Sequence, residues 1–181
     1  MSALPVSRDA LWQRVLWLDR ACVVRAQQSR WSRLLTWPLV GISRLGDGLV
    51  WAVVMVLLPW LDHGAGASRS IHLLVLGGIN LMLYLCLKRR IARPRPFASC
   101  EGIQAKTRAL DKFSFPSGHT LHAVSFTIVL SHHYPVLSAL LWLFCLLVAL
   151  SRVVLGLHYP TDVIFAAAMA ALTAELTLLI W

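Results

Sequence analysis

Two histidines and one aspartate are the residues of this sequence best suited to transfer a phosphoryl group. Asp162 follows His158 by four residues, across Pro160, and His119 stands at the start of an apolar segment. A carboxylate that fixes one imidazole nitrogen leaves the other nitrogen free as a nucleophile. A histidine titrates near neutrality and can protonate a leaving alkoxide. We therefore expect His158 to be a nucleophile, Asp162 to orient it and His119 to be a general acid.

Basic residues near these positions can hold a phosphate oxyanion. Lys88 and Arg95 belong to the run KRRIARPRP, and Arg152 precedes His158 by six residues. Arginine offers a planar fork of donors and lysine a compact charge. The alternative interpretation is that these residues anchor the ends of membrane spans.

The segment FPSGH, residues 115–119, predicts a helix that begins beside an anion. Ser117 can cap the helix, and Gly118 lets a backbone N–H approach an anion closely. The positive end of the helix adds to this attraction. The segment is also compatible with a simple helix start, and Asp162 with a simple partner of a helix dipole. Asp111 and Lys112 are further candidates, at the mouth of the pocket.

The composition excludes an ordinary soluble domain. Apolar residues make up 58% of the 181 residues and charged residues 14%, whereas soluble domains carry about 25% charged residues. Lysine and arginine number 17 against 8 acidic residues, for a net charge of +9. Because the basic residues lie between long apolar runs, they indicate contact with phosphate or anionic lipid, and we expect no nucleic-acid partner. The four cysteines lack pairing spacing, so we expect neither a disulfide nor a metal site.

Five apolar segments are candidates for membrane spans, at about 48–61 (extending back toward Pro38), 70–87, 118–134, 136–151 and 163–181. Pro135 separates the third from the fourth, and Pro160 opens the fifth. We therefore predict an all-α integral membrane bundle of about five transmembrane helices, forming a single membrane domain over residues 1–181. Asn80, in the second span, is expected to make an interhelical hydrogen bond.

Residues 1–33 are predicted to form an amphipathic N-terminal segment. Leu11, Trp12 and Val15 share an apolar arc, with arginines opposite, although Asp19 falls inside the arc. This pattern is typical of a helix that lies in the membrane interface. A surface helix packed on the bundle would account for it equally well.

Five crossings bring the chemically interesting positions to one membrane face. The end of the second span, the start of the third and the junction of the fourth and fifth all fall on that side. A loop at 88–117 connects the second and third spans, and long loops of this kind are usually functional.

The three motifs together resemble the phosphatidic acid phosphatase type 2 / vanadium haloperoxidase superfamily, in its membrane lipid phosphatase branch. That family's signature reads K-x6-R-P, then P-S-G-H, then S-R-x5-H-x3-D. The sequence supplies Lys88 to Pro96, Pro116 to His119, and Ser151 to Asp162 in the same order and with the same internal spacings. The match covers residues 88–162 only.

The resemblance implies a mechanism without a metal or other cofactor. His158 would attack phosphorus to form a phosphohistidine, Asp162 would orient it, and His119 would protonate the leaving group and then activate water. The oxygens would be held by Lys88, Arg95, Ser117, the Gly118 amide and Arg152. The signature does not require Arg89, Arg90 and Arg93, which are candidates for contact with a second phosphate or with lipid headgroups.

The resemblance also implies a bacterial multi-pass inner-membrane lipid phosphatase, with a polyprenyl diphosphate such as undecaprenyl diphosphate as the favoured substrate. Phosphatidylglycerophosphate or phosphatidate is the alternative. A vanadium-dependent haloperoxidase and a non-catalytic lipid-phosphate binder are more remote. The excess of positive charge on the site's face predicts a cytoplasmic site, whereas the resemblance often implies a periplasmic one. The oligomeric state is left open.

Overall fold

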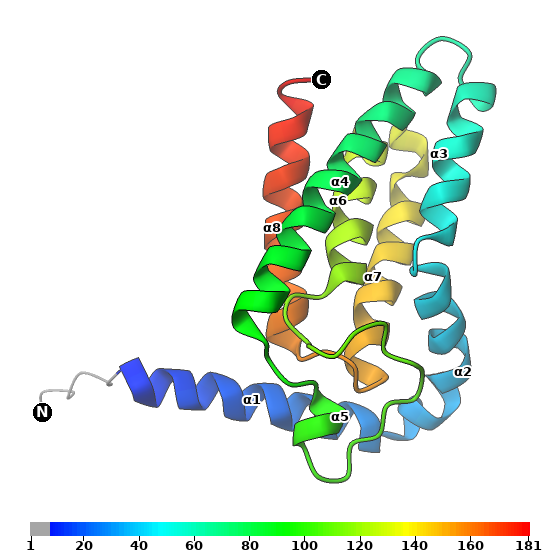
Figure 1. Cartoon of the computed structure of the whole chain (residues 1–181). Helices are drawn as coiled ribbons and strands as arrows, with labels where there is room; N and C mark the ends of the chain where they lie inside the picture. The colour runs from blue at the N-terminus through cyan, green and yellow to red at the C-terminus, as the bar shows by residue number, and fades with distance from the viewer. Residues whose placement is uncertain (1–7) are drawn as a thin grey trace, which may run out of the picture.

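The structure is a computed structural model that describes residues 8–181, and it confirms the expected all-helical fold (Figure 1). The one β-type pairing among these residues is an isolated bridge between Pro94 and Phe113. The helices, in chain order, are α1 (Arg8–Gln28), α2 (Arg30–Leu45), α3 (Leu49–Leu61), α4 (Gly66–Ile91), α5 (Pro96–Ser99), α6 (Gly118–His133), the 3₁₀ helix η1 (Pro135–Leu137), α7 (Ser138–Val154) and α8 (Pro160–Leu178).

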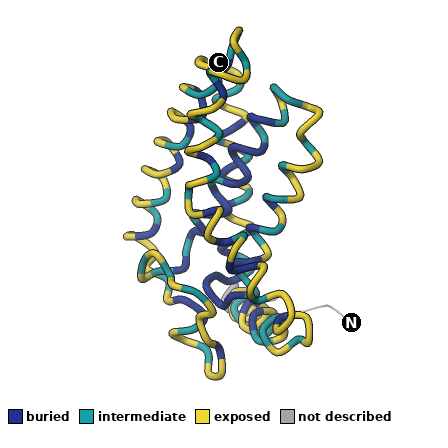
Figure 2. The backbone as a smooth tube through the Cα atoms, turned by 90° about the vertical axis from the view of Figure 1, so that its right-hand side faces the viewer, coloured by how far each residue is buried: buried dark blue, intermediate teal, exposed yellow. Residues whose placement is uncertain are grey.

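Helix α6 forms the centre of the bundle, and α4, α7 and α8 pack around it. Small residues of α8 such as Ala166 and Ala170 are fully buried, and they allow the helices to approach closely. Buried positions follow the inner sides of the helices and exposed positions their outer sides (Figure 2). Asn80 of α4 donates to the Ser125 hydroxyl at 2.9 Å and accepts from Thr173 at 2.9 Å. The predicted interhelical hydrogen bond of Asn80 is thus confirmed.

Each of the five predicted spans corresponds to a helix of the bundle, but not all of them meet the length needed to cross a membrane. Three helices are long and apolar enough, at Gly66–Ile91, Pro135–Val154 and Pro160–Leu178. A fourth span results if α2 and α3, bent by 48° at their junction, are taken together. Helix α6 has only 16 residues, or about 24 Å at ~1.5 Å per residue. The number of crossings therefore stays a prediction.

The N-terminal helices lie at the lower end of the bundle, where α1 runs across it and α2 leads upward into α3 (Figure 1). Helix α1 packs on α7 and α8 and buries Asp19 and Val23. Leu11, Trp12 and Trp17 remain exposed. Packing of this helix on the bundle is thus confirmed, and contact of its exposed side with a membrane surface stays a prediction.

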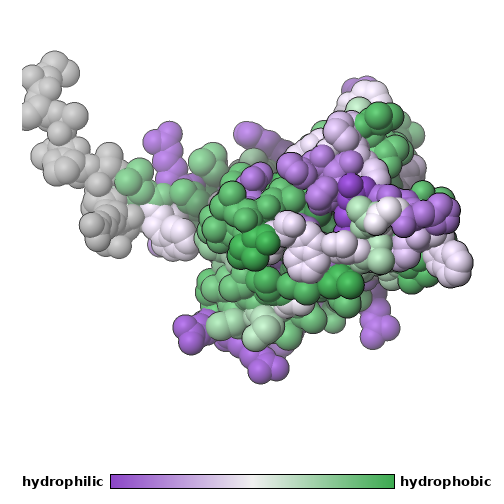
Figure 3. Space-filling model, turned by 90° about the horizontal axis from the view of Figure 1, so that it is seen from above, coloured by the Kyte–Doolittle hydropathy of each residue, from purple (hydrophilic) through white to green (hydrophobic). Residues whose placement is uncertain are grey.

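The two ends of the bundle differ in what covers them. The segment between α4 and α6, which includes α5, covers the lower end. The α3–α4 turn, η1 and the C-terminus lie at the upper end. Viewed from above, hydrophobic side chains surround much of this upper end and hydrophilic ones gather over one part of it (Figure 3).

Candidate active site

The three sequence motifs meet at the lower end of the bundle. The Ser117 amide, before α6, donates to the Asp162 carbonyl of α8 at 3.3 Å. Arg95, from the first motif, donates to the Leu157 carbonyl at 2.8 Å. The amide of His158 in turn donates to the Arg152 carbonyl at 3.0 Å. Segments about 70 residues apart therefore form one continuous hydrogen-bonded unit.

His158 lies at the centre of this unit and is almost completely buried. Its Nε2 is 3.1 Å from Nη1 of Arg95. A guanidinium can only donate hydrogen bonds, so Nε2 must be the acceptor and a neutral ring carries its proton on Nδ1. Nδ1 faces Oδ2 of Asp162 at 3.8 Å, which is longer than a hydrogen bond. The predicted His158–Asp162 pair is therefore assembled, but loosely.

The surroundings of His158 keep its imidazole neutral. Burial is the largest cause, and the positive charges of Arg152, Arg95 and Lys88 add to it, so the pKa of His158 lies well below its ordinary value. A neutral imidazole with an accepting Nε2 retains the lone pair that a nucleophile needs.

Local backbone geometry explains how His158 reaches this position. Helix α7 ends at Val154, and Gly156 follows with φ of +72°. A side chain would be strained at this positive φ, and a Cβ would also lie 3.0 Å from the carbonyl oxygen of Gln104, so the turn favours glycine. Helix α8 then begins at Pro160, as predicted, and the Asp162 carboxylate accepts from the Tyr159 amide at 2.9 Å.

Two buried cations, Lys88 and Arg95, share one carboxylate. Asp111 accepts from Lys88 Nζ at 2.8 Å and from Arg95 Nη2 at 3.0 Å, and its other contacts include the Tyr84 hydroxyl. Burial alone raises the pKa of Asp111, but hydrogen bonds from Lys88 and Tyr84 and the charges of Lys88 and Arg95 outweigh it and lower the pKa to about 2. Asp111 is therefore an anion that pairs with Lys88 and Arg95, two of the predicted phosphate ligands.

The remaining predicted phosphate ligands lie around the same centre. Arg152 is buried and donates to the Ser43 hydroxyl of α2, while its Nε has no partner among the described residues. Ser117 is the N-cap residue of α6, as expected, but its hydroxyl pairs with Thr120 at 3.0 Å rather than with a backbone amide. At Gly118, a Cβ would lie 2.8 Å from the Tyr84 ring.

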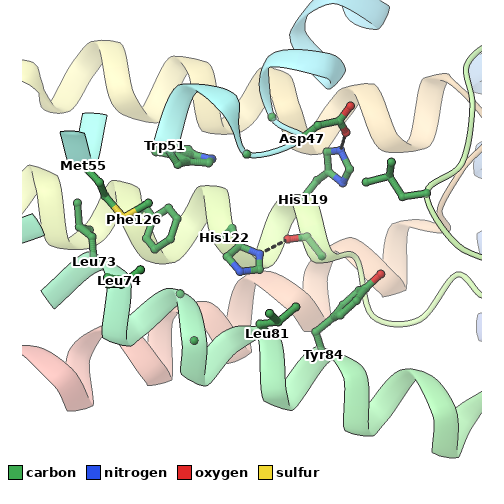
Figure 4. Close-up of a pocket in the computed structure, with 16 residues that line it drawn as sticks. Asp47, Trp51, Met55, Leu73, Leu74, Leu81, Tyr84, His119, His122 and Phe126 are labelled. Atoms are coloured by element: carbon green, nitrogen blue, oxygen red, sulfur yellow. Dashed lines mark hydrogen bonds and ion pairs between the residues drawn. The ribbon is translucent and has the colours of Figure 1, made fainter. Parts of the chain in front are cut away.

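His119 lies at the end of an apolar groove between α3, α4 and α6 (Figure 4). Its Nε2 pairs with the Asp47 carboxylate, which comes from the α2–α3 junction. The groove has a volume of about 480 Å³ and continues past Trp51, Leu73 and Phe126. Its lining is therefore polar near His119 and hydrocarbon-like along the rest of its length.

Several residues of the site have no place in the sequence motifs. The sequence patterns point to neither Asp47 nor Tyr84. They show Asp19 only as an exception within the apolar arc and Asp111 only as a candidate for the mouth of the pocket. Arg93 was expected to be available for a second phosphate or a lipid headgroup. It is instead held by Asp19, Thr161 and Asp162. That expectation is wrong for Arg93, because its guanidinium already donates hydrogen bonds to buried groups of the protein.

Known proteins are similar to this chain in sequence and in overall fold. The sequence model of the PAP2 superfamily matches residues 70–181. A PAP2-type phosphatidylglycerolphosphate phosphatase from Bacillus subtilis is similar in structure, with a TM-score of 0.73 and 25% identity, over 91% of this chain and 84% of that one. LpxE of Aquifex aeolicus gives a TM-score of 0.76 and 26% identity, over 90% and 93% of the two chains.

Two curated relatives are phosphatases by name. Lipid phosphate phosphatase delta of Arabidopsis thaliana is 32% identical over 160 residues, which are 76% of this chain and 36% of that protein. The chain thus spans about a third of that relative. Decaprenylphosphoryl-5-phosphoribose phosphatase of Mycobacterium tuberculosis is 28% identical over 144 residues, 72% of each chain. The three assembled motifs, the helical bundle and the match over residues 70–181 together show that this chain belongs to the PAP2 superfamily and is a multi-pass membrane member of it.

Proposed function

We propose that this protein is an integral membrane lipid phosphatase that works through a phosphohistidine. The observation that carries the proposal is His158, a neutral buried imidazole whose Nε2 faces Arg95 and whose Nδ1 faces Asp162. In the first step Nε2 attacks phosphorus, the bond to the leaving oxygen breaks, and His119 donates a proton to that oxygen. In the second step water attacks phosphorus and His119 accepts its proton, while the bond between phosphorus and Nε2 breaks, which frees His158 and releases phosphate.

The cations around His158 fit the charge of the transition state. Lys88, Arg95 and Arg152 are all at least 95% buried, and fixed donors in a water-poor site stabilise developing charge strongly. Ser117 and the Gly118 amide complete the proposed set of oxygen ligands. We propose that Lys88, Arg95 and Arg152 supply the positive charge without a metal ion. The phosphate would replace the Asp111 carboxylate on Lys88 and Arg95.

The groove beside His119 supports a lipid as the substrate. Its walls include Trp51, Leu73 and Leu81, and one end reaches Asp47 and His119. An acyl or prenyl chain could lie in the groove while its phosphate enters the site. We favour a polyprenyl diphosphate such as undecaprenyl diphosphate, and the mycobacterial relative is itself named for a decaprenyl-linked substrate. Phosphatidylglycerophosphate is the second candidate, from the name of the similar Bacillus protein.

A panel assay tests the proposal. Purified protein in detergent is given undecaprenyl diphosphate, phosphatidylglycerophosphate, phosphatidate or decaprenylphosphoryl-5-phosphoribose, and released phosphate is measured both with and without a chelator. We expect turnover of at least one lipid, most rapidly of the diphosphate. Radiolabelled substrate should leave acid-labile label on the wild type and none on His158→Ala. Absence of turnover with every lipid would overturn the lipid phosphatase, and turnover lost only with the chelator would overturn metal independence.

A further inference from the structure

Arg93 connects the N-terminal helix to the proposed active site. Its Nη1 donates to Oδ1 of Asp162 at 2.7 Å and to the Thr161 hydroxyl at 2.8 Å. Its Nη2 donates to Oδ2 of Asp19 at 2.7 Å. The guanidinium also lies 4.0 Å over the Tyr159 ring. Two carboxylates from helices far apart in the sequence therefore share one cation.

Asp19 is buried where an amphipathic helix would carry an apolar residue. Only 3% of its side chain is exposed. Besides Arg93, its carboxylate accepts from the amide of Thr161 at 3.1 Å and from the hydroxyl of the same residue. A buried carboxylate is costly unless it is paired and hydrogen-bonded. Asp19 is thus fixed to the first turn of α8, directly beside Asp162.

We propose that Asp19 is a positioning residue that acts on His158 through Arg93 and Asp162. This inference rests on the phosphatase function proposed above. The two carboxylate oxygens of Asp162 have different partners. Oδ1 accepts a hydrogen bond from Arg93, whereas Oδ2 accepts one from the Tyr159 amide and faces His158. The direction in which Oδ2 points depends on where Arg93 holds Oδ1.

Asp19 also balances the charge of Arg93. With Asp19 in place, one cation lies between two carboxylates, and Asp162 keeps negative charge to stabilise His158 as it becomes positive during attack on phosphorus. Without Asp19, Asp162 would be the only carboxylate left to neutralise Arg93, and it would turn toward the arginine and away from His158. The nucleophile would then be both less well oriented and less well stabilised.

The test is the rate constant for a single turnover of the lipid that the panel assay identifies, measured at saturating enzyme. This rate constant does not depend on what fraction of the preparation is folded. Loss of an outer partner in metal sites costs about 10- to 100-fold in activity, and we expect Asp19→Asn to lower the rate constant by about tenfold. Glu101→Gln, an exposed carboxylate of the segment between α4 and α6, is the matched control and should stay within twofold.

A double-mutant cycle separates positioning from general damage. Arg93→Gln removes the cation through which Asp19 acts. The double variant should therefore lose much less of its single-turnover rate constant than the product of the two single fold-losses. Arg93→Lys keeps a charge but lacks the fork that reaches both carboxylates, and it covers the case in which Asp19→Asn fails to fold. We expect a loss of about tenfold for it as well.

The outcomes distinguish failure of the positioning role of Asp19 from failure of the phosphatase function. If the rate constant of Asp19→Asn stays within twofold of wild type, the positioning role is overturned and the phosphatase function is left intact. If Asp19→Asn does not fold, the same result for Arg93→Lys overturns that role. Multiplicative effects in the cycle would overturn it as well. A wild-type protein that turns over no lipid phosphate would overturn both proposals together.

Discussion

Histidines are buried at both ends of the bundle, but only one end surrounds its histidine with charge. At the lower end, His158 faces Arg95 at 3.1 Å and Asp162 at 3.8 Å. At the upper end, His72 is fully buried, stacks on Trp181 at 4.9 Å between ring centroids, and has no hydrogen-bond partner for either nitrogen among the described residues. Burial alone therefore does not distinguish a reactive histidine from a structural one.

The charges of the two ends are also arranged differently. Arg69, at the upper end, is paired with Asp62 and lies 4.8 Å over the Tyr134 ring. At the lower end, Lys88 and Arg95 converge on a single carboxylate, Asp111, which we propose the substrate phosphate replaces. Arg69 is therefore held by one carboxylate and one ring, whereas at the lower end two cations converge on one carboxylate.

The largest expected effect is at His158. His158→Ala should lower phosphate release by at least about 10³-fold, as loss of a nucleophile does in other enzymes. Steady-state turnover of the lipid in detergent measures it, and circular dichroism of the same sample shows whether the helices are retained. Turnover near the wild-type level would assign the nucleophile elsewhere.

A smaller effect is expected at His119, because its proposed role depends on the leaving group. General acid catalysis contributes about 10²- to 10⁴-fold, and His119→Gln should lose this much with a lipid monoester such as phosphatidate, whose leaving group is an alkoxide. An aryl phosphate leaves without protonation, so the variant should lose much less with p-nitrophenyl phosphate. Equal losses with both substrates would contradict the general acid role.

The pH dependence of kcat/KM tests whether the cations at the lower end act on His158. Burial and the charges of Arg152, Arg95 and Lys88 lower the pKa of His158 well below 6.5, and the groups that face it also include His119 and Asp162. A lowered pKa means that the ring loses its proton at a more acidic pH. Activity that depends on neutral His158 should therefore persist below pH 6.5 before it declines. A decline of the His158-dependent step centred near pH 6.5 or higher would show that the cations do not act on this ring.

Asp111→Asn should produce a modest gain in substrate binding. The Asp111 side chain is 29% exposed and forms two ion pairs. At about 0.2–1 kcal/mol for each pair that water reaches, their loss should lower KM by roughly two- to thirtyfold. Because its pKa is about 2, wild-type Asp111 competes as an anion at every working pH. The matched control is Glu101→Gln, whose KM should not change. A raised KM would mean that Asp111 holds the cations in place for the substrate.

The smallest effect on activity is expected at the upper end. His72→Phe removes a buried ring whose nitrogens lack partners, and kcat/KM should stay within twofold of wild type. Removing an unsatisfied buried polar group is neutral or stabilising, by up to about 1–3 kcal/mol. Thermal unfolding in detergent measures this change. A loss of turnover would show that the upper end is coupled to the chemistry.

Much of this arrangement follows from the sequence. Spans of apolar residues, with Pro135 and Pro160 at their boundaries, predicted the order of the helices, and crossing parity predicted that the motifs meet at one end. The residues of the three motifs were named in advance because their spacing is local and fixed. The number of crossings did not follow in the same way, since α2 and α3 bend by 48° at their junction and α6 has only 16 residues.

The sequence by itself identified the residues that we propose carry the chemistry, because the spacing of a motif is a property of a short stretch of chain. Only the tertiary structure decided which carboxylates complete the site: Asp47 beside His119, Asp111 on Lys88 and Arg95, and Asp19 on Arg93. Asp19 and Asp47 lie more than 70 residues from their partners, and Asp111 more than 20 from Lys88. Pairs so far apart leave no periodic pattern, and burial selects them only once the helices have packed.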